Sequence, residues 1–189
     1  QKLRQITGLG MLNCKKALEE TGGDVEKAIE ALRKKGTAIA NKRAGRDTAQ
    51  GLIISYIHPG AQAGVLLELN CETDFVARNE AIAAFGKDIA MHIAAMKPHC
   101  LNPEDISEEY LAKEREIAKE QLLNQGKPAN MIDKIMEGKM GKIYKEVCLM
   151  KQAFIKDDKK SVEEVLKELI AKTGENIRIK NFSHFEIGA

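Results

Sequence analysis

The sequence predicts an α+β fold in which a helical N-terminal part precedes a core of antiparallel strands and helices. Three observations lead to this prediction. Short segments with helical spacing of apolar residues fill the first 36 positions, two β-branched runs flank the turn sequence HPGAQAG, and a long helical stretch precedes a last strand-like segment. The order of these segments predicts an α+β domain that is interrupted by helices.

Composition and charge are typical of a soluble globular protein. Charged residues make up 31% of the 189 positions and hydrophobic residues 43%. The net charge is only +2 and no run of five like charges occurs, so we expect no nucleic-acid binding. Neither a membrane-spanning apolar stretch nor a signal peptide is visible, and the scattered cysteines fit a reducing compartment. We therefore expect a cytoplasmic protein that does not bind membranes.

Residues 1–36 predict a compact module of three helices, which glycines separate. Because the apolar pattern already includes the first residues, we expect the first helix to begin before Gln1. Residues 37–50 are small, polar and mildly basic, and they predict a linker. The expected apolar faces of the three helices consist of Leu3 and Ile6; of Met11, Leu12 and Leu18; and of Val25, Ala28, Ile29 and Leu32.

Residues 51–189 predict an α+β core, which begins with a β-hairpin. Its strands are expected from Leu52 to Ile57 and from Val65 to Cys71, with proline and glycine in the turn between them. A helix from about Asn79 to Lys97 follows, and Pro98 ends it. Its expected inner stripe consists of Ile82, Phe85, Ile89, Ile93 and Met96.

An antiparallel helical hairpin is expected as an insertion at about residues 104–146. Gly126 can close its first helix and Pro128 can open its second. The first helix has a sparse apolar set, so we expect the hairpin to pack mainly against itself. The apolar residues are Leu111, Ala118 and Leu122 in the first helix, and Ile132, Ile135, Met136, Met140, Ile143 and Val147 in the second.

Three elements are expected after the hairpin. A strand from Leu149 to Ile155 leads to a helix, which a capping box starting at Ser161 opens. The last strand is expected from Asn176 to Ile187. Its period-two pattern places Ile177, Ile179, Phe185 and Ile187 on one face.

No catalytic, metal-binding or nucleotide-binding motif is present in the sequence. It lacks the glycine-rich phosphate loop G-x-x-x-x-G-K-[ST], the H-E-x-x-H pattern and any zinc-type spacing of cysteine and histidine. A cysteine nucleophile stays formally open, because Cys71 is near Asp74 in the sequence and His92 follows about a helix later. A buried thiol at a strand end is the favoured interpretation. We expect no enzyme activity, no cofactor and no metal.

The segment NCETDFVARN, residues 70–79, places an aromatic residue among polar ones between a strand and a helix. Loops at such junctions often carry function. From the pattern alone, a Phe75 that fills the core is favoured over a Phe75 that binds a partner. The polar neighbours on both sides of it instead favour a ring that points outward. Both alternatives stay open at this point.

NCETDFVARN resembles a signature of the elongation factor Ts family. Two further segments, TGLGMLNCKKALEETGGDVEKAIEALRKKG and KDIAMHIAAMKP, are similar to that family's three-helix, ubiquitin-associated-like N-terminal module and to a third family motif. The similarity continues through the GKP turn and the closing FEIGA. The resemblance implies a guanine-nucleotide exchange factor that binds elongation factor Tu and promotes GDP release by disturbing its magnesium and phosphate site.

The resemblance also implies which residues contact elongation factor Tu. At some of them another interpretation stays open: His92 equally fits an ordinary histidine at the core edge, and at least one of Met11 and Leu12 is expected in the core. The implied contact residues are Asp74, Phe75, Thr73, Val76, His92, Ala63, Gly64, Met11, Leu12 and Lys15.

The chain resembles the short form of the family, which implies a homodimer and a two-to-two complex with elongation factor Tu. Since no cysteine follows Cys148, a disulfide near the C-terminus cannot link such a dimer. The alternative function is a ubiquitin-associated-like adaptor that binds another protein partner. That alternative explains the N-terminal helices but leaves TDFVARN unexplained.

Overall fold

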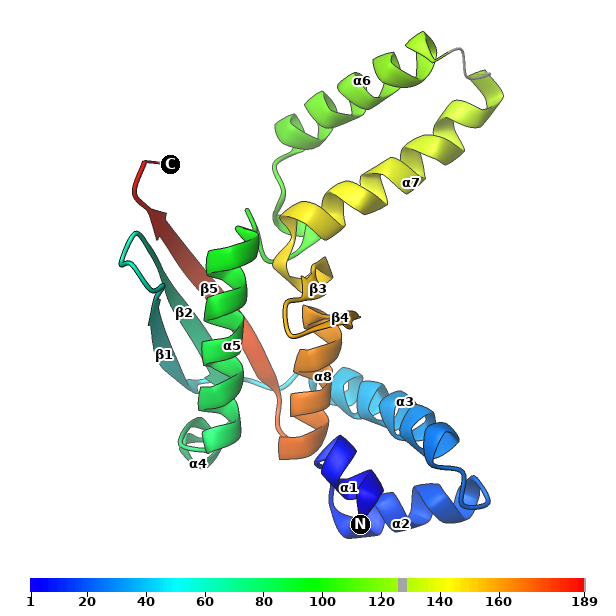
Figure 1. Ribbon diagram of the computed structural model, residues 1–189, viewed down its shortest axis with the longest axis vertical. Coiled ribbons are helices and arrows are strands. Elements are labelled where there is room, and N and C mark those ends of the chain that lie inside the picture. The colour runs from blue at the N-terminus through cyan, green and yellow to red at the C-terminus, as the bar shows by residue number, and fades with distance from the viewer. Residues whose placement is uncertain (126–128, 189) are drawn as a thin grey trace. The chain divides into compact units, whose positions relative to one another are not determined.

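The computed structural model describes residues 1–125 and 129–188, and in these ranges it combines helices with antiparallel strands (Figure 1). The α+β prediction is therefore confirmed. The chain divides into two compact units: Gln1–Ala94 together with the segment from Glu163 onward, and Ala95–Val162. None of the helices in the described ranges has both the length and the apolar character that crossing a membrane requires.

The first unit begins with the helices α1 (Lys2–Thr7), α2 (Met11–Glu20) and α3 (Val25–Arg43). The Asp24 carboxylate caps α3 by accepting a hydrogen bond from the Lys27 amide at 3.0 Å. The three helices share a small apolar core of Leu3, Cys14, Ala17, Ala28 and Leu32.

The inner face of α2 differs from the expected one. Met11 is 70% exposed and Leu12 is 65% exposed, so the expectation that one of them is core was wrong. Both lie in the first turn of the helix, and the core is filled one turn later by Cys14 and Ala17. Ile6 is likewise exposed. The structure thus leaves an apolar surface at the start of α2.

Helix α3 continues to Arg43, so the expected linker was wrong for residues 37–43. Gly36 and Ala40 are buried one and two turns beyond Leu32, which extends the buried stripe. Gly36 lies against α8 (Val162–Thr173), since a Cβ at Gly36 would be 3.2 Å from the Ala171 Cβ. The absence of a side chain at this position allows the two helices to approach closely.

An antiparallel sheet forms the centre of the first unit. Its strands in the described part of the chain are β1 (Gln50–Ile57), β2 (Ala63–Cys71) and β5 (Ile177–Glu186), in the order β1-β2-β5. The predicted β-hairpin is confirmed, because β1 and β2 are consecutive and pair in register.

Helix α5 (Glu80–Met96) covers one face of this sheet (Figure 1). Four of the five predicted inner residues, Ile82, Phe85, Ile89 and Ile93, are buried, whereas Met96 is exposed. The closest approach is at Gly86, where a Cβ would lie 1.8 Å from Ile54 Cδ1 and 2.9 Å from Leu69 Cδ1.

A β-bulge divides β5 into two halves. The pairing with β2 passes from Leu69 opposite Ile179 to Glu68 opposite Asn181, so one residue of β5 is skipped. A bulge reverses the alternation of side chains along the rest of a strand. Ile177 and Ile179 are consequently buried, whereas Phe185 is 64% exposed and Ile187 is 77% exposed. The prediction that all four share one face was wrong.

The second unit contains the helices α6 (Glu108–Asn124) and α7 (Ala129–Val147). Ser107 caps α6 by accepting a hydrogen bond from the Tyr110 amide at 3.2 Å. The two helices lie side by side (Figure 1), and they are joined by a hydrogen bond that Lys139 Nζ donates to Gln121 Oε1 at 3.0 Å. The predicted turn residues Gly126 and Pro128 and the side chain of Ile132 lie outside the described residues.

Short elements precede and follow these two helices in the sequence: η1 (Pro103–Asp105), η2 (Leu149–Lys151), β3 (Ala153–Phe154) and β4 (Asp157–Ser161). The expected strand from Leu149 to Ile155 was wrong in its first part, where η2 lies. Cys148 forms an isolated parallel bridge with Cys100, and the Leu149 amide donates to the Cys100 carbonyl at 2.9 Å. The backbone then turns. Of the residues expected in this strand, only those of β3 form strand pairs, and their partner is β4.

Cys100 and Cys148 face one another in this bridge as free thiols, with their sulfur atoms 3.5 Å apart. Burial raises the pKa of Cys148 from 9.0 to about 12, and the contact between its thiol and Cys100 acts in the same direction. Burial also raises the pKa of Cys100. Both thiols are therefore protonated at neutral pH.

The raised pKa of Cys148 predicts that the protein loses stability in alkali. An unfolded thiol loses its proton near pH 9.0, whereas the folded one keeps it up to about pH 12. The contribution of Cys148 to the free energy of unfolding should thus be constant below pH 9 and fall by about 1.4 kcal/mol per pH unit between there and about pH 12. Urea titrations of the wild type and of Cys148→Ala from pH 8 to pH 11 measure this. Equal pH slopes in the two proteins would contradict the prediction.

Candidate functional site

The segment after β2 forms a single helical turn, α4 (Asp74–Ala77), before α5 begins. Thr73 is its N-cap residue, and Thr73 Oγ1 accepts a hydrogen bond from the Val76 amide at 3.4 Å. Asn79 then starts α5, because Asn79 Oδ1 accepts from the Ala81 amide at 2.8 Å. The backbone of α4 is therefore fixed at both ends, and the turn packs against β1 and β2.

Phe75 is the most exposed large apolar side chain of the described residues, at 84%. Its neighbours Val76 and Ala77 are half-buried. One side of the turn, with Val76 and Ala77, packs against the protein, and the other side presents the phenyl ring to solvent. This confirms the prediction of an outward ring, and the alternative that Phe75 fills the core was wrong.

Asp74 lies beside Phe75 at the surface. Its carboxylate forms an ion pair with Arg78 at 3.1 Å, one helical turn later; the Arg78 side chain is largely exposed and that of Asp74 is about half exposed. Such exposed pairs contribute little to stability. The Asp74 carboxylate is therefore accessible to a partner at low energetic cost.

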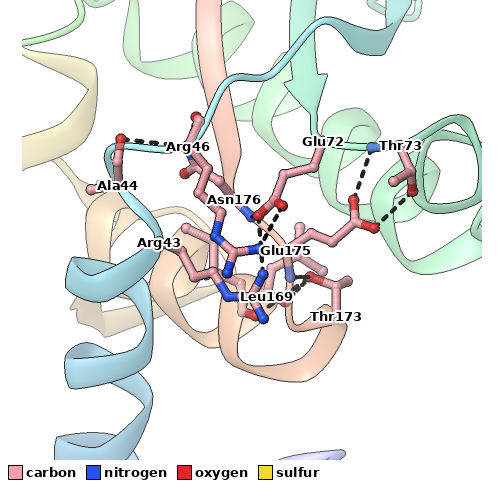
Figure 2. Close-up of polar contacts among 10 residues, drawn as sticks. Arg43, Ala44, Arg46, Glu72, Thr73, Leu169, Thr173, Glu175 and Asn176 are labelled. Carbon is pink, nitrogen blue, oxygen red and sulfur yellow. Dashed lines mark hydrogen bonds and ion pairs between the residues drawn. The ribbon is translucent and has the colours of Figure 1, made fainter.

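A carboxylate from a distant part of the chain holds the start of α4. Glu175, in the loop between α8 and β5, accepts two hydrogen bonds from Thr73: one from the backbone amide to Oε2 at 3.1 Å and one from the hydroxyl to Oε1 at 2.7 Å (Figure 2). Hydrogen bonds to an ionised acceptor are stronger than those between neutral groups. Glu175 therefore contributes a strong anchor to this turn.

Glu72 makes the reciprocal contact. Its Oε1 accepts from the Asn176 backbone amide at 2.7 Å, and the carboxylate pairs with Arg46 at 3.1 Å and Arg43 at 3.4 Å (Figure 2). The Asn176 amide, followed by the charge of Arg46, holds the pKa of Glu72 below its usual range. Glu72 is thus ionised at neutral pH. We call Glu72, Thr73, Glu175 and Asn176 the carboxylate clamp.

The clamp also holds the chain just after α3. Asn176 Nδ2 donates to the Arg46 carbonyl at 2.8 Å and to the Ala44 carbonyl at 3.4 Å (Figure 2). Arg178 donates to the same Ala44 carbonyl. The sequence did not predict these contacts, because their partners lie more than a hundred positions apart and no local motif marks them.

Cys71 does not have the properties of a nucleophile. It is buried, and its thiol donates a hydrogen bond to the Thr73 carbonyl at 3.1 Å. Burial, followed by the nearby charge of Glu175, raises the pKa of Cys71, so the reactive thiolate is disfavoured. Among the residues that the structure describes, no group of three or more histidine, cysteine or acidic side chains could hold a metal ion.

The predicted contact residues of the N-terminal helices lie together on α2. Met11 and Leu12 form its exposed first turn, and Lys15 follows one turn later. Lys15 pairs with Glu19 at 3.7 Å, and both side chains are exposed. The start of α2 thus combines an apolar surface with a cation.

The other predicted contact residues are less accessible. His92 is fully buried on α5, and Gly64 is buried beneath Ile57, whose Cδ1 would lie 2.8 Å from a Cβ at this glycine. Ala63, at the start of β2, is half-buried. The His92 side chain therefore does not reach the surface in this conformation, which agrees with the interpretation of it as a core histidine.

Comparison with known proteins places the chain in a family. The sequence model of the family described as Elongation factor TS matches residues 11–189. Elongation factor Ts of Desulforamulus reducens is 53% identical over 188 residues, which cover 100% of this chain and 87% of that protein. Those of Thermosipho melanesiensis and Thermotoga maritima are 53% and 51% identical, with 96% and 94% of their own lengths covered. The chain therefore belongs to the elongation factor Ts family of translation elongation factors.

Proposed function

We propose that this chain is a guanine-nucleotide exchange factor that binds elongation factor Tu in the cytoplasm and promotes release of its GDP. The observation that carries the proposal is the exposed phenyl ring of Phe75 on an anchored helical turn. A ring that is 84% exposed in the free chain gains free energy when a partner buries it. In this proposal the ring and Asp74 enter the magnesium and phosphate site of elongation factor Tu and disturb it.

The proposed mechanism is thermodynamic coupling. A factor that binds the nucleotide-free partner more tightly than the nucleotide-bound one weakens nucleotide binding by the same factor. Burial of one phenylalanine contributes about 1.5 to 3 kcal/mol, which corresponds to roughly 10 to 100-fold weaker GDP binding. This mechanism needs no catalytic group, cofactor, metal or nucleotide on the factor itself, and we propose none.

A larger effect requires further contacts. We propose that the three N-terminal helices act as a ubiquitin-associated-like module, which grips the nucleotide-binding domain of elongation factor Tu through Met11, Leu12 and Lys15. The exposure of these residues at the start of α2 supports this. We further propose that α6 and α7 form an inserted antiparallel hairpin that adds contacts of its own. The bond between Lys139 and Gln121 is consistent with such a hairpin.

We also propose a homodimer and a two-to-two complex with elongation factor Tu. The face of the sheet opposite α5 supports this, since Ile57 and Phe185 flank Gly64 across three paired strands and are exposed there. Leu66, in the next row, is exposed on the same face. Sedimentation that gives the mass of one chain at micromolar concentration would contradict the dimer.

The proposed function is tested by release of a fluorescent GDP analogue from elongation factor Tu. We expect the chain to accelerate release in a concentration-dependent and saturable way, and to leave an unrelated GTPase loaded with the same analogue unaffected. A release rate that does not change at saturating concentrations would contradict exchange activity. Binding of a different protein in that event would favour the ubiquitin-associated-like adaptor, which does not explain Phe75.

A further inference from the structure

The carboxylate clamp joins two pairs of neighbouring residues in a reciprocal way. Glu175 accepts the backbone amide of Thr73, and Glu72 accepts the backbone amide of Asn176, at 3.1 and 2.7 Å (Figure 2). Each pair thus supplies one carboxylate and one amide. If the two segments separate, both carboxylates and both backbone amides lose their hydrogen-bond partners.

The clamp contributes more to the start of α4 than the local cap does. A helix of four residues is not stable alone, because one turn fixes several backbone angles for few hydrogen bonds. The local cap bond, from the Val76 amide to Thr73 Oγ1, is long at 3.4 Å. The bond from the same hydroxyl to Glu175 is 2.7 Å and is made to a carboxylate. Glu175 therefore determines where Thr73, and with it the following turn, is held.

The clamp also links α4 to the N-terminal helices. Glu72 pairs with Arg43 at the end of α3 and with Arg46 beyond it, and Asn176 holds the carbonyl groups of Ala44 and Arg46. Helix α3 packs on α2 in turn through the shared core. The turn that carries Phe75 and the chain that follows α3 are thus fixed to the same four residues.

We propose that Glu175 is a positioning residue for nucleotide exchange, which holds α4 through Thr73 so that the backbone that carries Phe75 is ordered before the partner arrives. This inference rests on the proposed exchange function. A turn whose backbone is ordered in advance avoids the entropy cost of ordering it on binding. Loss of the clamp leaves the ring chemically intact but attached to a backbone that is no longer held in one place.

The test compares Glu175→Ala and the milder Glu175→Gln with Glu168→Ala. Glu168 lies on α8, where its half-exposed carboxylate pairs with Arg33 at 3.8 Å, and it serves as the matched control because it does not belong to the clamp. We expect Glu175→Ala to lower the second-order rate constant for GDP release roughly tenfold. Glu175→Gln, which keeps one oxygen acceptor, should fall between Glu175→Ala and the wild type, and Glu168→Ala should match the wild type.

Hydrogen exchange in the free protein provides a readout that does not depend on elongation factor Tu. We expect the amides of residues 73–78 to exchange faster in Glu175→Ala than in Glu168→Ala, while the buried middle of α5 stays protected. Melting curves confirm that each variant is folded. If Glu175→Ala is not folded, Glu175→Gln carries both comparisons.

The outcomes separate the two proposals. If the wild type does not accelerate GDP release, the proposed exchange function is wrong. Faster amide exchange at residues 73–78 in Glu175→Ala would then still show that the clamp holds α4. If the wild type is active and a folded Glu175 variant releases GDP as fast as Glu168→Ala, the positioning role is overturned and the function stands. Unchanged amide exchange at residues 73–78 would also overturn it.

Discussion

Replacing Phe75 by alanine is expected to remove most of the acceleration of GDP release while hardly changing the melting temperature. The ring is 84% exposed, so the folded protein loses almost no buried surface with it. The proposed contact with elongation factor Tu, by contrast, loses the ring entirely. We expect GDP release at a fixed subsaturating concentration to slow by about 10 to 100-fold, with residual binding through the other contacts.

Phe85→Ala is the matched control for this variant. Phe85 is the same residue type on the next helix, α5, but its side chain is buried. Truncating a buried phenylalanine costs about 3 to 5 kcal/mol, which for a chain of this size lowers the melting temperature by roughly 6 to 20 °C. The Phe85→Ala molecules that remain folded should accelerate GDP release as much as the wild type does. A Phe75→Ala protein that melts early yet exchanges normally would reverse the assigned roles of the two rings.

Gly86→Ala is expected to be strongly destabilising, although it adds only a methyl group. The new Cβ would lie 1.8 Å from Ile54 Cδ1 and 2.9 Å from Leu69 Cδ1, and both neighbours are buried in the sheet. Because both neighbours are buried, the clash must be relieved by rearrangement of the Ile54 side chain or by a shift of α5 away from the sheet. Overpacking of this kind costs about 3 kcal/mol, which corresponds to a melting temperature lower by roughly 6 to 12 °C.

Gly141→Ala provides the opposite control. Gly141 also lies inside a helix, α7, but a Cβ there would meet no atom within 4 Å. Alanine should therefore stabilise the helix by roughly 0.5 to 1 kcal/mol through its higher helix propensity. Calorimetry of both variants measures the difference. If Gly86→Ala and Gly141→Ala shifted the melting temperature in the same direction, helix propensity, rather than the approach of α5 to the sheet, would decide the effect at Gly86.

Local patterns in the sequence predicted most elements of the fold. The buried stripe of α5 and the pairing of β1 with β2 follow from periodicity and turn residues, and both are present. The extension of α3 escaped prediction, because a glycine and alanines look like a linker until the fold places Ala171 of α8 against Gly36. The bulge in β5 also escaped, since the skipped residue is set by pairing with Glu68 and Leu69 of another strand.

The candidate site was predicted only in part, for the same reason. Phe75 is marked by a local segment, and its polar neighbours already indicated an outward ring. Glu175 is one of 28 acidic residues in the chain, and nothing near it in the sequence separates it from the others. Its role depends on Thr73, which the fold brings beside it from the other end of the chain. Contacts of this range are not encoded in any local pattern.

The carboxylate clamp has a consequence for how this region can change over generations. Glu72 and Glu175 each bind a backbone amide, and almost every residue type offers the same amide. A substitution at Asn176 or Thr73 other than proline therefore preserves that bond, whereas a substitution at either glutamate removes it. For these two backbone bonds, drift among homologues should accordingly be asymmetric: the bonds require the two acids but not particular residue types at positions 73 and 176, where only the side-chain bonds of Thr73 and Asn176 constrain the residue.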